Sequence, residues 1–216
     1  MERLGSVDEL PADLSFVLTI GVFDGVHRGH QRMLHETLRA ATARQARAVV
    51  VTFDPHPDAV LRRETPTLLC DPGERIARFA EAGVDYAVMQ RFDREFASQS
   101  AEQFLRRVAT DRSLRGLVMT GETAFGRDRA GTRATVHQLS RSMGFEVLDC
   151  REVALAGERI SSTRLRALLV RGHLAQVRRL LGRRYAVIGT VVAGDRRGRE
   201  LGYPTANLSF ESPVAL

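Results

Sequence analysis

Two histidines, His27 and His30, stand three positions apart with Arg28 and Gly29 between them. At this spacing both imidazoles can lie on one side of a helix start and donate hydrogen bonds to a phosphate and its developing negative charge. Gly29 has no side chain that would block a nucleotide backbone. A zinc site is the weaker interpretation, because there is no third ligand at the usual spacing and no cysteine pair nearby.

The residues around this pair predict a strand, a glycine-rich turn and a helix. The apolar run from Phe16 to Ile20 is typical of a buried strand, and Gly21 and Gly25 follow it. After His30, residues that suit a core recur at helical spacing: Met33, Leu34, Thr37, Leu38 and Ala41. Backbone N–H groups and the positive end of the helix dipole meet at such a turn, which therefore suits a phosphate.

The stretch from Arg159 to Arg166 is a second candidate for phosphate binding. Ser161 and Ser162 suit the start of a helix, and capping alone would account for them. Capping does not require Arg164 and Arg166 in the first turn, where the helix dipole disfavours cations. A bound polyphosphate would offset that cost, so we interpret the stretch as a polyphosphate site.

Strands and helices alternate along most of the chain. The predicted strands are residues 16–20, 48–53, 84–89, 117–120, 145–148 and 185–192. This alternation predicts an α/β fold with a parallel sheet covered on both faces, whose ligands bind at the carboxyl ends of the strands. Residues 1–14 are polar and are expected to be a loose lead-in. Phe92, Phe96 and Phe104 are expected to belong to the core.

Composition limits the classes of partner. The 216 residues are 44% apolar, which suffices for a core, and no apolar run reaches membrane-spanning length. No signal peptide is recognisable at the start, and Cys70 and Cys150 form no disulfide framework, so we expect a reduced, cytoplasmic compartment. All 32 basic residues are Arg. The absence of Lys reflects codon bias or a phosphate-binding surface, and it excludes a Walker A loop. The arginines are scattered without interleaved aromatic residues, so nucleic acid is not favoured as a partner.

The stretch from Thr19 to His30 resembles the His-x-Gly-His signature of the nucleotidyltransferase superfamily. More narrowly, it is similar to the adenylyltransferase module of bacterial bifunctional riboflavin kinase/FAD synthetases. Further segments carry the same resemblance: residues 52–57, 121–132, 159–166 and 185–208. The last of these resembles the opening of a riboflavin kinase barrel. The resemblance implies a Rossmann-like doubly wound parallel sheet with a truncated β fragment, divided into an adenylyltransferase domain (1–182) and an incomplete kinase-like segment (183–216).

The resemblance also implies a reaction, in which AMP passes from ATP to FMN to give FAD and pyrophosphate. Catalytic residues would be His27, His30 and Arg164. Nucleotide-binding residues would be Gly21, Phe23, Asp24, Gly29, Ser161, Ser162, Thr163 and Arg166. Flavin-binding residues would be His56, Glu122, Phe125 and Gly126. Asp24 would help to place Mg²⁺. The partners implied are ATP and FMN, with neither nucleic acid nor a membrane, and the sequence does not set the oligomeric state.

The segment from Gly121 to Gly126 departs from the family pattern. It is one residue shorter, and Thr123 or Ala124 stands where the family has Asn or Asp and an aromatic residue. Two alternatives therefore stay open: a related nucleotidyltransferase that uses another phosphorylated acceptor or CTP, and a non-catalytic nucleotide- or flavin-binding paralogue. Riboflavin kinase activity is not expected, because about thirty residues cannot close a barrel and the strand with the catalytic Glu is missing.

Overall fold

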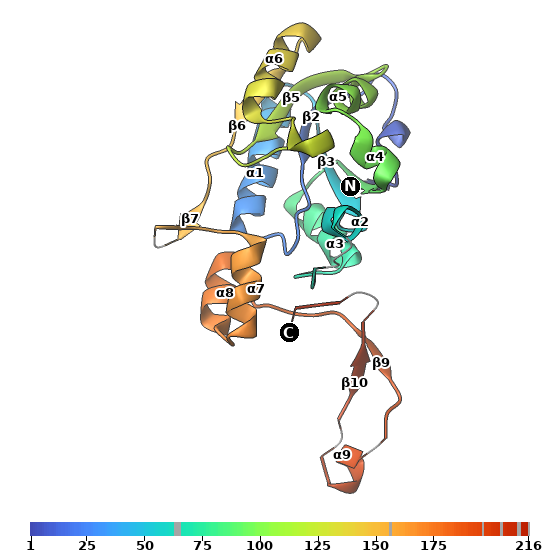
Figure 1. Ribbon diagram of the computed structural model, residues 1–216, viewed down its shortest axis with the longest axis vertical. Coiled ribbons are helices and arrows are strands. Elements are labelled where there is room, and N and C mark those ends of the chain that lie inside the picture. The colour runs from blue at the N-terminus through green and yellow to red at the C-terminus, as the bar shows by residue number, and fades with distance from the viewer. Residues whose placement is uncertain (63–65, 156, 196, 204, 211–212, 216) are drawn as a thin grey trace.

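The computed structural model describes the chain except residues 63–65, 156, 196, 204, 211–212 and 216 (Figure 1). Its centre is a parallel sheet of six strands in the order β1-β4-β3-β2-β5-β6. The strands are β1 Glu2–Leu4, β2 Ser15–Ile20, β3 Arg47–Asp54, β4 Tyr86–Arg91, β5 Ser113–Met119 and β6 Glu146–Asp149. The predicted doubly wound α/β fold is therefore confirmed.

The order of the strands places a switch point beside β2. The chain leaves β2 and builds outward through β3 and β4, then returns to place β5 and β6 on the other side of β2. Ligands of open α/β sheets bind in the crevice at the carboxyl end of such a strand. Gly21, the residue that follows β2, begins the turn that leads to both histidines.

Helices cover both faces of the sheet. Helices α1 (Arg28–Ala43) and α3 (Pro72–Ala82) pack on one face, and α5 (Ala101–Ala109) and α6 (Arg133–Met143) pack on the other. Successive residues of β2 point to opposite faces, so Phe16 joins the second core and Val17 the first, each with no exposed area. A strand buried on both faces is apolar throughout, which explains the apolar run in the sequence.

Local capping chemistry fixes several helix ends where the sequence predicts them. The Asp71 carboxylate accepts from the Glu74 N–H at 2.9 Å to begin α3, and Gly83 ends that helix with a φ of 89°. Ser100 and Gln103 form the predicted capping box of α5. These caps fix where α3 and α5 begin, and therefore which of their residues face the sheet.

Two predictions about the ends of the chain are wrong. Residues 1–14 are not a loose lead-in, because β1 pairs with β4 and a short 3-10 helix follows at Val7–Glu9. Leu4, Val7 and Leu10 repeat every third residue and are buried against the sheet. The strand predicted for 185–192 is shorter, since only Thr190–Val192 form β9.

The remaining elements follow the carboxyl ends of the sheet strands or lie beneath the sheet in the view of Figure 1. They are α2 Pro57–Leu61, α4 Arg94–Ser98, β7 Ala154–Leu155, β8 Glu158–Arg159, α7 Ser162–Val170, α8 Leu174–Leu181, α9 Arg197–Glu200 and β10 Asn207–Ser209. Helices α7 and α8 share a third core cluster, and the β9–β10 hairpin projects away from the body of the molecule (Figure 1). None of the helices in the described ranges is long and apolar enough to cross a membrane.

Candidate active site

A cavity of about 860 Å³ opens where the sheet strands end. His27 and His30, which follow β2, line it together with a group of aromatic residues. The aromatic residues are Phe23, Phe53, Phe92, Phe96, Phe104 and Phe125. Phe104 belongs to the core as predicted, whereas Phe92 and Phe96 are only partly buried and pack against it; all three also line this cavity.

The two histidines form a stacked pair at the start of α1, as their spacing predicts. Their ring centroids lie 3.6 Å apart with an angle of 14° between the planes. His27 is the N-cap residue, and its Nδ1 accepts a hydrogen bond from the His30 N–H at 3.3 Å. Because Nδ1 of His27 accepts, the proton of its neutral ring is assigned to Nε2.

Burial keeps both imidazoles neutral. It lowers the pKa of His27 from 6.5 to about 4, because the charged ring would lose its hydration. Burial also holds the pKa of His30 well below 6.5, and the Arg75 charge and any protonation of His27 act in the same direction. The Nδ1 atom of His30 is buried and has no hydrogen-bond partner in the described part of the chain. The pair can therefore offer neutral ring N–H donors to an anion at neutral pH.

The backbone between β2 and α1 is strained. Phe23, Gly25 and Val26 have φ angles of 54°, 77° and 38°, in the left-handed region that side chains disfavour. A Cβ at Gly25 would lie 2.8 Å from the Cβ of Leu69, so glycine is required there for space as well as conformation. Such strain persists only where neighbouring contacts over-determine the backbone, and it clusters at functional sites.

Gly29 leaves room for the ring of His27. A Cβ at Gly29 would meet the Cε1 and Nδ1 atoms of His27 at 3.1 Å. The position at Gly29, where a nucleotide backbone is expected to approach, is thus next to the His27 ring. Gly21, also predicted to bind nucleotide, lines the cavity beside the Phe23 ring.

Asp24 lies behind the cavity and is not among its lining residues. Its carboxylate is 2% exposed, and Oδ1 accepts from the N–H groups of Leu69 and Cys70 at 2.9 and 3.3 Å. Oδ2 accepts from Arg166 at 2.5 Å. No cluster of three His, Cys, Asp or Glu residues that could hold a metal occurs in the described ranges. Both carboxylate oxygens of Asp24 thus accept hydrogen bonds from the protein, and the expected role of Asp24 in placing Mg²⁺ stays a prediction.

The start of α7 is only partly brought to the cavity. Ser161 and Ser162 line it, whereas Thr163, Arg164 and Arg166 do not. The Ser161 hydroxyl caps the helix by accepting from the Arg164 N–H at 3.2 Å. The Ser162 hydroxyl donates to the backbone oxygen of Asp24 at 2.9 Å. This contact joins the second motif to the histidine turn across the carboxyl end of the sheet.

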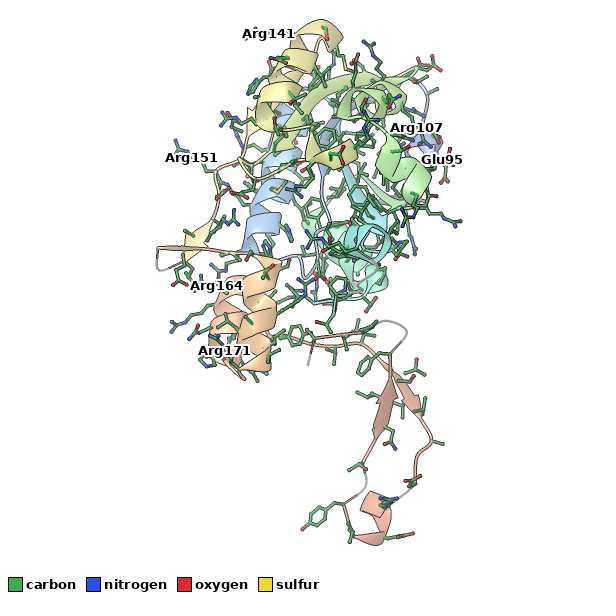
Figure 2. All side chains as sticks on the ribbon, viewed as in Figure 1. Glu95, Arg107, Arg141, Arg151, Arg164 and Arg171 are labelled. Atoms are coloured by element: carbon green, nitrogen blue, oxygen red, sulfur yellow. The ribbon has the colours of Figure 1, made fainter. Side chains whose placement is uncertain are left out.

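The two arginines of this motif differ in their surroundings. Arg166 donates to the Thr67 backbone oxygen at 2.7 Å and to Asp24, which fixes its guanidinium. Arg164, which lies at the start of α7 (Figure 2), pairs with the exposed carboxylate of Glu158. An exposed ion pair contributes only about 0–1 kcal/mol, so Arg164 can exchange Glu158 for a phosphate far more readily than Arg166 can leave Asp24.

All four residues predicted to bind flavin line the cavity. They are His56, Glu122, Phe125 and Gly126. His56 caps α2 by accepting from the Asp58 N–H at 3.1 Å, and burial lowers its pKa. Gly126 has a φ of 74°, and a Cβ there would lie 2.5 Å from the Ala101 backbone nitrogen. Its glycine is therefore needed to seat the loop on the start of α5.

The shortened segment closes as a tight turn. The Thr123 N–H donates to the Thr120 backbone oxygen at 3.2 Å, and the Thr120 N–H donates to the Thr123 hydroxyl at 3.0 Å. Thr123 therefore uses its side chain within the turn, although it still lines the cavity. The turn is therefore closed by hydrogen bonds within the segment itself.

Four arginines that are not among the predicted site residues also line the cavity. This arginine rim consists of Arg127, Arg129, Arg151 and Arg159, all of which are exposed. Arg159 pairs with Glu122 at 2.8 Å, and Arg151 lies on the stretch between β6 and β7 (Figure 2). Scattered arginines carry no sequence signal of this kind, because the rim forms only when three separate segments meet.

Two protein families match successive parts of this chain. Residues 11–164 match the FAD synthetase family, and residues 181–215 match the riboflavin kinase family. The chain is 35% identical over 201 residues to the bifunctional riboflavin kinase/FMN adenylyltransferase of Escherichia coli K12. It is 34% identical over 199 residues to that of Haemophilus influenzae. These matches cover 92% and 91% of this chain but only 64% and 65% of the relatives.

Two solved structures are also similar. One, described as a macrolide-efflux protein from Streptococcus pneumoniae, is 28% identical with a TM-score of 0.84, over 98% of this chain and 69% of that one. The other, pantothenate synthetase from Thermus thermophilus, is 19% identical with a TM-score of 0.51, over 84% and 76%, and supports the nucleotidyltransferase-like fold alone. Because the first family match spans most of the sequence, the chain belongs to the FAD synthetase family.

Proposed function

We propose that this chain is an ATP:FMN adenylyltransferase, which transfers AMP from ATP to FMN and releases pyrophosphate. The observation that carries the proposal is the stacked, neutral pair of His27 and His30 on the wall of a large cavity at the sheet switch point. Family membership supports it, and so does the similarity to relatives named for this activity.

The reaction requires an oxygen of the FMN phosphate to attack the α-phosphorus of ATP in line, as pyrophosphate leaves. No group on the protein needs to form a covalent bond. His27 and His30 would donate ring N–H groups to the pentacoordinate α-phosphate, where negative charge develops. Donors fixed before the substrate arrives need no reorganisation, and their contribution grows where water is excluded.

The walls of the cavity suggest where each substrate part would lie. The phenylalanines of the cavity other than Phe23, together with His56, Glu122 and Gly126, would hold the planar flavin. Ser161, Ser162 and the arginine rim would hold the β- and γ-phosphates, joined by Thr163 and by Arg164 once it leaves Glu158. Gly21, Phe23 and Gly29 would shape the turn beside the α-phosphate. Asp24 and Arg166 would position this turn from behind without touching substrate.

The proposal keeps two units in the chain. Residues 1–182 would be the transferase domain, and residues 183–216 would be a kinase-like segment. Within the part that the structure describes, the second unit contains one two-stranded hairpin, β9–β10, with exposed apolar side chains. A two-stranded hairpin offers no closed barrel, so we expect no phosphorylation of riboflavin by this chain.

A chromatographic assay of the purified chain tests both statements. Mg²⁺ and ATP are supplied with either FMN or riboflavin, and the products are separated. We expect FAD and pyrophosphate from FMN and no FMN or FAD from riboflavin. Absence of FAD in the FMN reaction, despite measurable ATP binding, would reject the proposal.

Parallel reactions with CTP and with other phosphorylated acceptors would then test a sibling nucleotidyltransferase, the alternative that the shortened segment 121–126 favours. Nucleotide or flavin binding without any product would indicate a non-catalytic paralogue.

A further inference from the structure

The strained histidine turn, residues 21–27, is held from behind by a second segment. This support segment comprises residues 67–75, which contain the first turn of α3. The N–H groups of Leu69 and Cys70 donate to the Asp24 carboxylate at 2.9 and 3.3 Å. The Gly25 N–H donates to Cys70 Sγ at 3.1 Å. Both central residues of the turn thus depend on one short stretch of backbone.

Two arginine side chains, one buried and one partly buried, extend the same support. Arg75 is 1% exposed and donates to the Thr52 hydroxyl at 3.0 Å, and Thr52 donates to the Val22 backbone oxygen at 2.9 Å. Arg183 donates to the Gly25 backbone oxygen at 2.9 Å and lies 3.6 Å from the Glu74 carboxylate. The first turn of α3 therefore fixes the histidine turn on both sides of Asp24.

The support segment is itself fixed by residues far along the chain. This tail segment, residues 213–215, lies parallel to Leu68: the Leu68 N–H donates to the Pro213 oxygen at 2.7 Å, and the Ala215 N–H donates to the Leu68 oxygen at 2.8 Å. The Tyr185 hydroxyl donates to the Ala215 oxygen at 2.5 Å. Ala215 is 4% exposed and packs in the same cluster as Leu69. The backbone N–H and oxygen of Leu68 are thus both hydrogen-bonded to the tail segment, while the N–H of its neighbour Leu69 donates to Asp24.

We propose that the tail segment positions the histidine turn, with Tyr185 and Ala215 as positioning residues for adenylyl transfer. The inference rests on the proposed function for its kinetic consequence alone. Phe23 and Val26 hold positive φ angles that must be imposed by surrounding contacts, and the tail segment completes those contacts through Leu68. Residues within the riboflavin kinase match would therefore complete the site built by the FAD synthetase match.

Two variants of the full chain remove these contacts separately. Ala215→Pro removes the N–H that donates to Leu68, and Tyr185→Phe removes the hydroxyl that donates to Ala215. Ala215→Gly keeps the N–H and serves as the control at the same site. Ala193→Pro is the proline control, since Ala193 is exposed and its N–H makes no backbone hydrogen bond in the described part of the chain.

Amide hydrogen exchange at Leu68, Leu69 and Cys70 is the first readout, because it needs no enzyme activity. We expect exchange there to become about tenfold faster in Tyr185→Phe and in Ala215→Pro, with core strands and both controls unchanged. Unchanged exchange in Tyr185→Phe would overturn the proposal even if Ala215→Pro failed to fold. The second readout is steady-state kinetics, in which kcat should fall about three- to tenfold with little change in KM. Faster exchange with unaltered kcat would also overturn it, whereas an inactive wild-type chain would reject the proposed function and leave the exchange result standing.

Discussion

The histidine turn and the arginine rim face the same cavity but are built in opposite ways. His27 is 5% exposed, neutral and stacked on His30, and its backbone is held by buried contacts. Arg127 and Arg129 are exposed on a short 3-10 helix, Arg127–Arg129, in which Asp128 and Arg129 have φ angles of 54° and 57°. Both regions carry backbone strain, yet only the histidine turn has its functional side chains locked in place.

This difference separates two tasks in a transfer reaction. Groups that bind charge appearing only in the transition state must be fixed in advance, because reorganisation at that moment costs rate. Groups that bind a polyphosphate already charged in the ground state can move as it arrives, so exposed and mobile cations suffice. The comparison predicts that losing a buried contact behind the turn lowers stability, that losing a histidine donor lowers kcat, and that changes in the rim alter KM.

The largest effect is expected from Asp24→Ala, which removes the carboxylate that joins the turn to the support segment. Arg166 and the N–H groups of Leu69 and Cys70 lose their acceptor, and breaking a buried pair from one side costs about 3–5 kcal/mol of unfolding free energy. Urea unfolding measures this loss. Asp195→Asn is the control, because its pair with Arg197 is exposed and should contribute almost nothing. Equal effects of the two changes would remove the distinction between the regions.

His30→Ala should reduce kcat by about 10²–10³ while changing stability little. The reason is the loss of one donor to the developing charge in a side chain whose Nδ1 makes no described hydrogen bond. His35→Ala on the exposed face of α1 is the matched control and should keep full activity. Steady-state kinetics with ATP and FMN, with thermal unfolding alongside, distinguishes the outcomes. A rise in KM at unchanged kcat would instead assign His30 to ground-state binding.

The pH dependence of stability tests whether the turn is neutral and buried. The pKa of His27 is about 4 in the folded chain and an ordinary 6.5 in the unfolded chain. Between these two pH values the unfolded chain therefore binds more protons than the folded chain. The free energy of unfolding should therefore be complete above pH 6.5 and fall by about 2 kcal/mol from His27 between pH 6.5 and pH 5. His27→Asn keeps a capping side chain and should remove this part of the decrease. Urea unfolding of both proteins at pH 7.5 and pH 5 measures it, and parallel losses would contradict a buried neutral His27.

The sequence predicts this site well where neighbours along the chain create it, and poorly where distant segments do. Helical spacing and glycines place His27 and His30 together at a strand end, because a strand and a helix dictate their own geometry. Asp24 and Arg166 are 142 positions apart in the sequence and pair only in the folded chain. Their residue types alone therefore do not reveal that each is occupied by the other. Nor do residue types reveal the positive φ angles of Phe23 and Val26, which long-range contacts impose.

The fold shows the same division. Strands β2 and β3 follow from continuous apolar runs, since burial on both faces requires them. The edge strand β1 escapes prediction because only Leu4 of its three residues is buried. Residues 185–189 read as a strand from their apolar character, yet Tyr185 instead packs with α7 and α8 and reaches the tail segment.

The smallest effect is expected at the rim, from Arg127→Ala. Its guanidinium is exposed and makes no ion pair within the described ranges, so stability should change little. Loss of one solvent-exposed phosphate contact contributes at most about 1 kcal/mol, so KM for ATP should rise no more than about fivefold at nearly constant kcat. Arg171→Ala, which removes the same charge from the far end of α7 (Figure 2), should leave KM unchanged. Raising the salt concentration should weaken the effect at Arg127, because exposed charges are screened, whereas the His30→Ala defect should persist. A salt-resistant fall in kcat at Arg127 would place that residue with the fixed group and end the distinction between turn and rim.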